Sequence, residues 1–192
     1  MQRPIPVETN QRIQIHQSNV MIRPAEPRDF QAIADIYNEA IAHGGMTMDG
    51  RLYTANDIQA MVQKMSSREI ILVADIEQEP EANIIGWGIV KQYSDRLGYQ
   101  VCCETSIYLT FSQRGKGYGR HLQTALMKQV EQFKYHHIVA KIVASNQSSI
   151  RFHQQFGFEL VGIQKEIGQM QGTWYDIAIM QCILPDIITS IP

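Results

Sequence analysis

The sequence lacks any apolar run that approaches the roughly 18 to 20 residues of a membrane helix, so we expect a soluble protein. Cysteines are few: Cys102, Cys103 and Cys182 are an odd number without a C-x-x-C pair, which suggests neither a disulfide framework nor a zinc site. The first 20 residues contain no continuous apolar segment and no small-residue cleavage site, so no secretory signal is indicated. These absences together predict a reducing, cytoplasmic compartment.

Positive charge is scarce as well, since 17 basic side chains stand against 19 acidic ones and the formal net charge is −2. The sequence therefore lacks the basic field typical of a nucleic-acid-binding protein, and a small molecule is the expected partner. At 192 residues the chain is long enough for one domain and too short for two ordinary ones. We expect that domain at residues 19–186, after a loosely ordered extension at 1–18 and before a tail at 187–192.

Within this domain the spacing of apolar residues predicts a mixed α/β fold. Apolar side chains recur every three or four residues near 27–41, 54–65, 117–133 and 146–156, which is typical of helices that bury one face. Thr54 and Asp57 resemble a capping box at the start of the second helix. Seven apolar or alternating runs predict strands at 19–25, 69–76, 84–93, 101–110, 137–144, 158–168 and 173–184. Short turns at 77–83 and 168–172 predict antiparallel pairs.

The segment QRGKGYGR, at residues 113–120, follows a predicted strand and opens a predicted helix. Its glycines allow a ligand to approach the backbone closely, and a helix N-terminus presents unpaired N–H groups with a partial positive charge. Together with the flanking arginines these features suit a pyrophosphate. The spacing fits neither the P-loop nor the dinucleotide-binding fingerprint, which disfavours ATP and NAD. A glycine-rich turn with solvated basic side chains is the alternative.

The stretch RGKGYG, at residues 114–119, resembles the [QR]-x-x-G-x-[GA] signature of the Gcn5-related N-acetyltransferases, the GNAT family. The later NQSSIRFHQQFGF is similar to that family's Asn-x-x-[SA]-x-x-x-[YH]-x-x-x-Gly-Phe helix. IRPA…DIYNEAI, ETSIYLTFSQRGKGYG, SIRFHQQFGF and GTWYDIAIMQ also look like the subgroup that acetylates phosphinothricin and methionine sulfoximine or sulfone. The resemblance spans roughly residues 20–184 and implies the GNAT fold: a mixed, largely antiparallel sheet, splayed at the acetyl-CoA site and flanked by about four helices.

The resemblance implies acetyl-CoA as co-substrate, and it implies no metal. In this family the strand before the glycine loop contacts the pantetheine arm, and the loop holds the pyrophosphate. The implied cofactor contacts are Ile107, Tyr108, Leu109, Arg114, Gly115, Lys116, Gly117, Tyr118, Gly119, Arg120 and Asn146. Asn146 equally suits the N-cap of the following helix, and one asparagine can fill both roles.

Acyl transfer to an amine requires the neutral amine, so a base or a water-linked proton path is useful at neutral pH. Glu104 is the predicted catalytic base, because it interrupts an apolar strand and because a glutamate four residues before the equivalent tyrosine lines the acceptor site in the subgroup. A solvent-facing or ion-paired glutamate is the alternative. His153 is the second predicted catalytic residue, since it stands where many family members carry a tyrosine as acid for the leaving thiolate. A core histidine, with Tyr108 as the donor instead, is the alternative.

An amino-acid acceptor also offers a carboxylate, for which a bidentate arginine is the best partner. Arg96 and Tyr99 match an arginine and a tyrosine at the same separation in the subgroup, so the resemblance implies that they bind substrate together with Glu104. A plain loop arginine is the alternative. The subgroup commonly forms dimers with the acceptor site near the interface, which implies a homodimer here, and Trp174 is expected to serve packing or that contact.

The predicted activity is therefore acetyl-CoA-dependent N-acetylation of a small amino-acid-like amine, by direct transfer in a ternary complex. Acetylation of a peptide N-terminus or of another amine is one alternative, and a peptide or polycation would favour an acidic, open groove. A non-catalytic sensor of acyl-CoA is another, and such a protein could dispense with Glu104.

Overall fold

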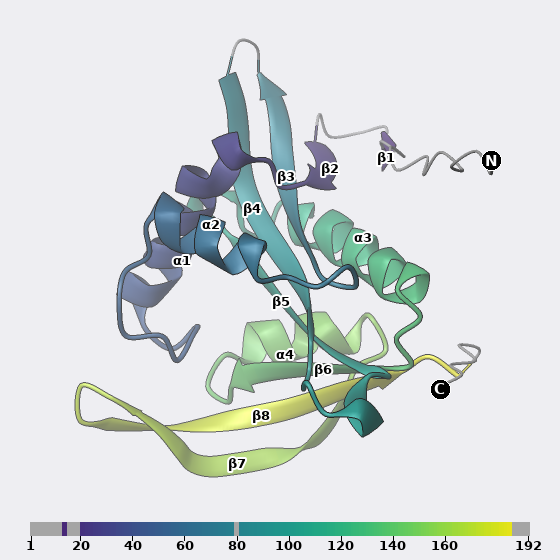
Figure 1. Cartoon of the computed structure of the whole chain (residues 1–192). Helices are drawn as coiled ribbons and strands as arrows, with labels where there is room; N and C mark the ends of the chain where they lie inside the picture. The colour runs from purple at the N-terminus through teal and green to yellow at the C-terminus, as the bar shows by residue number, and fades with distance from the viewer. Residues whose placement is uncertain (1–12, 15–19, 79–80, 186–192) are drawn as a thin grey trace, which may run out of the picture.

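The computed structural model describes residues 13–14, 20–78 and 81–185, which form an eight-stranded sheet with helices on both faces (Figure 1). The spatial order of the strands is β1-β2-β3-β4-β5-β6-β8-β7. Their bounds are β1 Ile13–Gln14, β2 Val20–Pro24, β3 Ile70–Gln78, β4 Glu81–Gln92, β5 Cys102–Leu109, β6 His137–Val143, β7 Glu159–Met170 and β8 Thr173–Ile183. The helices are α1 Phe30–His43, α2 Ala55–Gln63, α3 Tyr118–Gln132 and α4 Gln147–Gln154, with short 3₁₀ turns η1 Pro27–Asp29, η2 Leu97–Tyr99 and η3 Phe111–Gln113. The predicted fold class is confirmed.

Most predicted elements begin and end near the predicted positions, and their largest differences lie in the hairpins. Strand β1 is an eighth strand that the sequence did not predict. The predicted turn at 77–83 is shorter, because β3 continues to Gln78 and β4 already begins at Glu81. Likewise β7 continues to Met170, so the final turn is only Gln171–Gly172, both with positive φ (48° and 80°). Two-residue turns with positive φ match the twist of paired strands, which lets the ladder continue to the very end of the hairpin.

The structure tests the predicted domain boundaries, at residues 19 and 186, only in part. Residues 1–12, 15–19 and 186–192 lie outside the described residues, so the extension at 1–18 and the tail at 187–192 remain expectations. Ile13–Gln14 is described, and it pairs antiparallel with β2.

Two apolar clusters fill the space between the helices and the sheet. One packs α1 and α2 against β3 and β4, and it includes Ile33, Ile58 and Trp87. The other packs α3 and α4 against the opposite face, and it includes Leu122, Leu126 and Ile150. Thr54 and Asp57 form the predicted capping box, which fixes the start of α2 on the first face.

The sheet is antiparallel except where β5 meets β6. This parallel ladder spans only Cys102–Glu104 against His137–Val139, although β5 runs on to Leu109 and β6 to Val143. Beyond Glu104 the two strands diverge, and each keeps its pairing with its other neighbour, β4 or β8. The sheet is therefore open along one seam, and its backbone groups there are available to a ligand.

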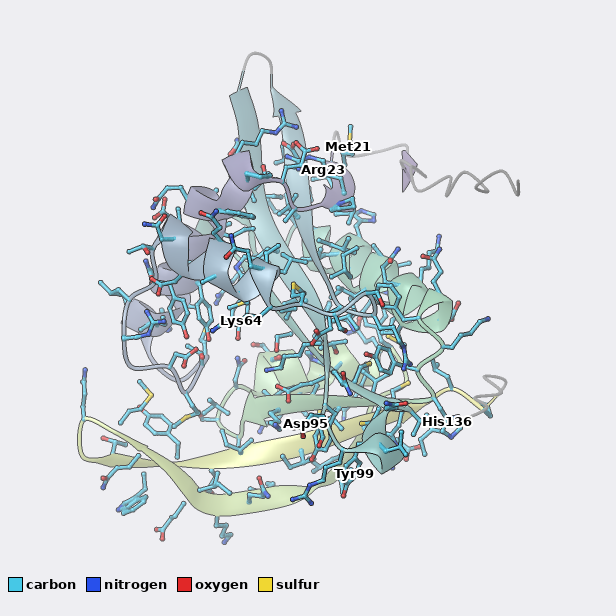
Figure 2. The ribbon with its side chains drawn as sticks, in the orientation of Figure 1. Met21, Arg23, Lys64, Asp95, Tyr99 and His136 are labelled. Atoms are coloured by element: carbon cyan, nitrogen blue, oxygen red, sulfur yellow. The ribbon has the colours of Figure 1, made fainter. Side chains whose placement is uncertain are left out.

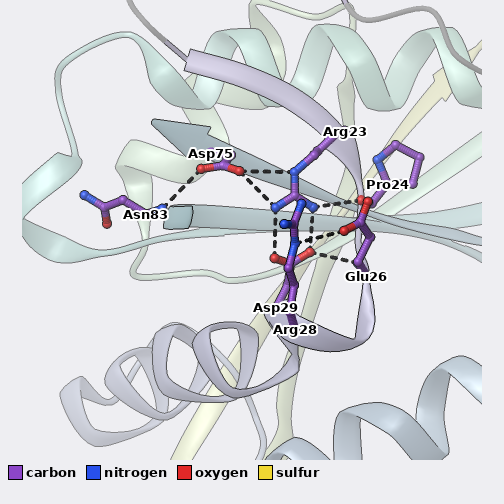
Figure 3. A network of polar contacts seen from close by, with 7 residues as sticks. All are labelled: Arg23, Pro24, Glu26, Arg28, Asp29, Asp75 and Asn83. Carbon is purple, nitrogen blue, oxygen red and sulfur yellow. Dashed lines mark hydrogen bonds and ion pairs between the residues drawn. The ribbon is translucent and has the colours of Figure 1, made fainter. Parts of the chain in front are cut away.

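A buried ion-pair network joins β2, β3 and η1 (Figure 3). The guanidinium of Arg23 on β2 donates to both carboxylate oxygens of Asp29 (2.6 and 2.9 Å) and to Asp75 on β3 (2.9 Å). Burial alone would raise the pKa of Asp29, but hydrogen bonds from Arg23 and from the Glu26 N–H outweigh burial and hold that pKa below its usual range. The network thus fixes η1 and the start of α1 onto the sheet.

Removal of the Arg23 guanidinium from this network is expected to destabilise the folded protein. The Arg23→Met variant leaves two carboxylates close together without a counter-charge, so the free energy of unfolding should fall by about 3–5 kcal/mol. Urea denaturation measures this loss. Arg28→Met is the matched control, because the Arg28–Glu26 ion pair is more than half exposed on both sides and should contribute less than about 1 kcal/mol. Equal losses in the two variants would contradict the structural role of the network.

Candidate active site

A cleft of about 510 Å³ opens where β5 and β6 diverge. Strand β5 contributes the wall Thr105–Leu109, and β6 contributes Ala140–Ile142. The glycine loop closes one end of the cleft, and the first turns of α4 close its side. All three predicted strand contacts, Ile107, Tyr108 and Leu109, lie in this wall.

The glycines of the loop divide into two kinds. Gly115 and Gly117 have φ of 74° and 89°, the left-handed region that other residues avoid, and a Cβ on either would meet no atom within 4 Å. Gly117 is the N-cap of α3, and the Arg120 N–H donates to its carbonyl oxygen (3.0 Å), so the N–H groups of Tyr118 and Gly119 have no intrahelical partner. A Cβ on Gly119 would instead lie 3.3 Å from Leu109 Cδ1 and 3.6 Å from Phe152 Cε2. The first two glycines keep the cleft open, and the third lets α3 approach β5 and α4.

The basic side chains of the loop are held in different ways. Arg114 lies over the ring of Phe111, 3.6 Å from its centroid, and burial lowers the pKa of its guanidinium. Arg120 donates to Gln155 Oε1 (2.6 Å), and both arginines line the cleft. Lys116 donates to Gln113 at the exposed surface and lies outside the lining.

The remaining predicted cofactor contacts are Tyr118 and Asn146. Tyr118 packs against the core beneath α3 and is not part of the cleft wall. Asn146 lines the cleft and also caps α4, because its Oδ1 accepts from the Ser149 N–H (3.1 Å). The structure therefore permits both roles considered for this asparagine.

Glu104 lies at the point where the ladder between β5 and β6 ends, and it is 9% exposed. Its carboxylate accepts from Lys141 on β6 (2.8 Å) and forms an ion pair with Lys91 on β4 (3.3 Å). A buried carboxylate needs such partners, so the ion-paired alternative is realised in the structure. Lys141 lines the cleft described above, whereas Lys91 lines a different pocket.

This second pocket, of about 360 Å³, lies between α2 and the face of β4 and β5 that carries Trp87, Ile89 and Lys91. It shares Ser106 and Tyr108 with the cleft, so the two spaces adjoin across β5. Its complete lining is Tyr37, Asp49, Tyr53, Met61, Lys64, Met65, Glu69, Trp87, Ile89, Lys91, Ser106 and Tyr108.

A hydrogen-bonded aromatic cluster forms one end of the pocket. The hydroxyls of Tyr37 and Tyr53 both donate to Asp49, and Tyr37 also exchanges a hydrogen bond with Thr47. Tyr108 packs edge-on against Tyr37, with ring centroids 4.8 Å apart. Burial raises the pKa of Tyr108, so its phenol remains protonated at neutral pH and can donate a hydrogen bond.

His153 is buried in the side of the cleft that α4 forms. Its Nδ1 lies 2.8 Å from the carbonyl oxygen of Ser149, which can only accept, so Nδ1 carries the proton. Nε2 is buried and has no partner among the described residues. Burial lowers the pKa of this imidazole, although the Ser149 hydrogen bond acts in the opposite sense. The role of His153 as proton donor stays a prediction, and it requires a proton on Nε2 that this tautomer lacks.

The neutral state of His153 makes a testable contribution to stability. Its pKa is lower in the folded protein than in the unfolded chain, so below about pH 6.5 the unfolded chain binds a proton that the folded protein does not. Stability is therefore lost as pH falls, by up to about 1.4 kcal/mol per pH unit for one group. In His153→Asn, which keeps a donor to Ser149, urea denaturation between pH 7 and 5 should show a shallower loss. Parallel curves for the two proteins would contradict the buried neutral imidazole.

The structure does not bring Arg96 and Tyr99 into either pocket lining. Both are exposed on the loop that carries η2, and Tyr99 contacts the ring of Tyr93. Figure 2 shows Tyr99 apart from Lys64, which lies beneath α2 near the second pocket. Their role in binding substrate stays a prediction, and within this chain the cations that line the second pocket are Lys64 and Lys91.

Sequence reasoning did not single out Lys91, Lys141 or Asp49. The two lysines had a signal, because each is a charged residue inside an otherwise apolar strand, as Glu104 is. Asp49 had none, since it lies in a polar loop where an acidic residue is ordinary.

The cysteines do not contribute to either pocket lining. All three are free and buried, and burial raises the pKa of Cys102 to about 11. A thiol with so high a pKa is a poor nucleophile at neutral pH, so a packing role in the core fits this residue. Among the described residues there is no cluster of three or more metal-ligating side chains, and no helix is long and apolar enough to span a membrane.

Comparison with known proteins matches residues 22–179 to the acetyltransferase (GNAT) domain. The chain therefore belongs to the GNAT family, and it is an enzyme of the N-acetyltransferase class. This confirms the resemblance carried by the glycine loop and the α4 segment.

Two relatives and one solved structure show how close the similarity is. The L-methionine sulfoximine/L-methionine sulfone acetyltransferase of Salmonella typhimurium is 27% identical over 86% of this chain and 95% of its own length. Phosphinothricin N-acetyltransferase of Streptomyces coelicolor is 25% identical over 84% and 94%. The structure of yncA, an acetyltransferase from Salmonella typhimurium with its cofactor acetyl-CoA, superimposes with a TM-score of 0.82 at 28% identity, covering 90% of this chain and 98% of that one.

Proposed function

We propose that this protein transfers the acetyl group of acetyl-CoA to the amino group of a small amino-acid-like acceptor, of the phosphinothricin, methionine sulfoximine or methionine sulfone type. One observation carries the proposal: a cleft with a glycine loop and a pocket with charged side chains meet on β5, beside Glu104. The relatives named for these acceptors match most of the chain and supply the substrate class.

The residues of the cleft suit acetyl-CoA. The open faces of Gly115 and Gly117 and the free N–H groups at the start of α3 form a seat for pyrophosphate, with Arg114 and Arg120 beside it. Beyond Glu104, the edge of β5 that faces β6 has no partner strand among the described residues, so its backbone can bind the pantetheine arm in the manner of an added strand. Acetyl-CoA supplies the thioester from which the acetyl group is transferred.

The residues around the junction of the two pockets would perform the transfer in a ternary complex. Glu104 takes a proton from the acceptor's ammonium, and the neutral nitrogen can then attack the acetyl carbonyl carbon. As the nitrogen–carbon bond forms, the carbon–sulfur bond breaks and the electron pair remains on sulfur. The nitrogen then gives up its second proton, which reaches this sulfur through the Tyr108 phenol, so the products are the amide and the CoA thiol. His153 lines the same cleft from α4.

Purified protein incubated with acetyl-CoA and a panel of amines tests the proposal through thiol release. Methionine sulfone, methionine sulfoximine and phosphinothricin should be acetylated faster than a polyamine, an aminoglycoside or a peptide N-terminus. Faster acetylation of the polyamine or the peptide would contradict the proposed amino-acid-like acceptor and indicate one of those amines instead. Binding of acetyl-CoA without turnover of any amine would favour a sensor.

We also propose that the protein forms a homodimer through β7 and β8. The edge strand β7 exposes Leu160, Val161, Ile163 and Ile167, and Trp174 on β8 is 57% exposed. An exposed apolar edge strand that remained uncovered would invite aggregation, so a second copy is a suitable cover. Sedimentation analysis at micromolar concentration tests this, and a monomer would contradict it.

We also propose a cytoplasmic compartment for this protein. The free, buried cysteines support it, because disulfides are rare in that reducing environment.

A further inference from the structure

Lys91 is placed directly beside the candidate base. On the β4–β5 ladder Lys91 is the cross-strand partner of Glu104, and its Nζ lies 3.3 Å from Glu104 Oε1. The two side chains differ in exposure to solvent: 46% of the Lys91 side chain is exposed, but only 12% of the Glu104 side chain. Lys91 also lines the second pocket, so its ammonium can leave Glu104 and remain within that pocket.

The spacing of this pair matches the head group of an α-amino acid. One carbon separates the amino nitrogen from the carboxyl carbon, so the nitrogen and the nearer carboxylate oxygen are about 3 Å apart. The carboxylate of Glu104 can therefore accept from the acceptor's ammonium while the ammonium of Lys91 donates to its carboxylate. No other cation of the second pocket has an ion pair with Glu104 among the described residues.

We propose that Lys91 is the residue that binds the acceptor's α-carboxylate and thereby selects amino acids over simple amines. The inference rests on the proposed function, and it assigns to Lys91 the role that the family resemblance implies for Arg96. When an amino acid binds, Glu104 exchanges Lys91 for the substrate ammonium and Lys91 exchanges Glu104 for the substrate carboxylate. Every charge keeps an opposite partner, so the exchange carries little electrostatic cost.

An amine without a carboxylate meets a different arrangement. Its ammonium would join Lys91 and Lys141 around the single carboxylate of Glu104, which puts three cations against one anion. Like charges at such distances repel, and this penalty falls only on the wrong substrate class. Selectivity then comes from Lys91 twice, by attraction of the amino acid and by repulsion of the amine.

The test compares methionine sulfone with 3-(methylsulfonyl)propylamine, which is the same molecule without its carboxylate. In Lys91→Met, kcat/KM for methionine sulfone should fall by at least about 10-fold, since a charge-assisted hydrogen bond is lost. The kcat/KM of this variant for the amine should equal or exceed the wild-type value. Calorimetric titration measures binding independently of turnover. The ratio of the dissociation constants of the two ligands should change between wild type and Lys91→Met in the same direction as the ratio of their kcat/KM values.

Two further variants make the comparison specific. Lys141→Met removes a cation that is even closer to Glu104, at 2.8 Å, but lines the other cleft. Because Lys141 meets the ammonium of either ligand next to Glu104, its removal should change kcat/KM for both by the same factor and leave their ratio unchanged. Arg96→Met should leave the ratio unchanged as well. Equal losses for both ligands in Lys91→Met, or a change of ratio in Arg96→Met alone, would overturn the proposal. If wild-type protein acetylates no amine, the proposed function fails, and the calorimetric ratio still decides the role of Lys91.

Discussion

The Glu104→Gln variant is expected to lose at least about 100-fold in kcat, because a positioned general base typically contributes that factor or more. Glutamine keeps the size of the side chain and one acceptor oxygen, but it cannot take a proton from the acceptor. The affinity for acetyl-CoA should change little, since Glu104 is not part of the cleft lining. Thiol release with methionine sulfone measures the rate, and calorimetry measures the binding of acetyl-CoA.

The matched control for this substitution is Glu131→Gln, an exposed position on α3 that contributes to neither pocket. Its rate should stay at the wild-type value. The Lys141→Met variant, which removes one ion pair from Glu104 and keeps the carboxylate, separates loss of the base from loss of its partners. A Glu104→Gln rate within a few-fold of wild type would exclude Glu104 as the base.

The second large effect is expected at the glycine loop. Gly117→Val should weaken the binding of acetyl-CoA by at least about 100-fold, equivalent to two charge-assisted hydrogen bonds from the first N–H groups of α3. At a φ of 89° a β-branched residue is strained, so the backbone shifts and those N–H groups lose their alignment. The new side chain also projects into the open face of the loop. Calorimetric titration with acetyl-CoA measures the loss.

Gly172→Val provides the control for backbone strain. Gly172 has a φ of 80° and no atom within 4 Å of a built Cβ, as Gly117 has, but it lies in the turn between β7 and β8. Both variants should lose a similar free energy of unfolding, on the order of 1–2 kcal/mol. Only Gly117→Val should lose acetyl-CoA binding. Tight binding retained in Gly117→Val would remove the loop from the cofactor site.

The elements of the fold could be predicted because their signals are local. Helix α3 repeats apolar residues with helical spacing, and Thr54 and Asp57 mark the start of α2 within four residues of sequence. The glycine loop is equally local, since both its φ angles and the helix that follows it depend on adjacent residues. The hairpin ends were predicted less well, because the length of a ladder depends on the partner strand as much as on the strand itself.

The acceptor side of the site was harder to predict, because it is assembled from distant segments. Arg96 lies eight residues before Glu104 in the sequence, yet the loop that carries it turns to the surface, outside both pocket linings. Lys91 and Lys141 come from β4 and β6, and only the register of three strands brings them to one carboxylate. Asp49 contacts Tyr37 because a loop folds back over α1.

The sequence by itself determined the order of the helices and of strands β2 to β8, the glycine loop at a helix N-terminus, and the presence of one acidic residue in the strand that precedes it. These features arise from neighbouring residues, whose spacing and φ preferences act before any distant contact forms. Only the tertiary structure decided where β5 and β6 part, which cations surround Glu104, and that two pockets meet at Tyr108. Those depend on strand register and packing, which are set by contacts between segments far apart in the chain.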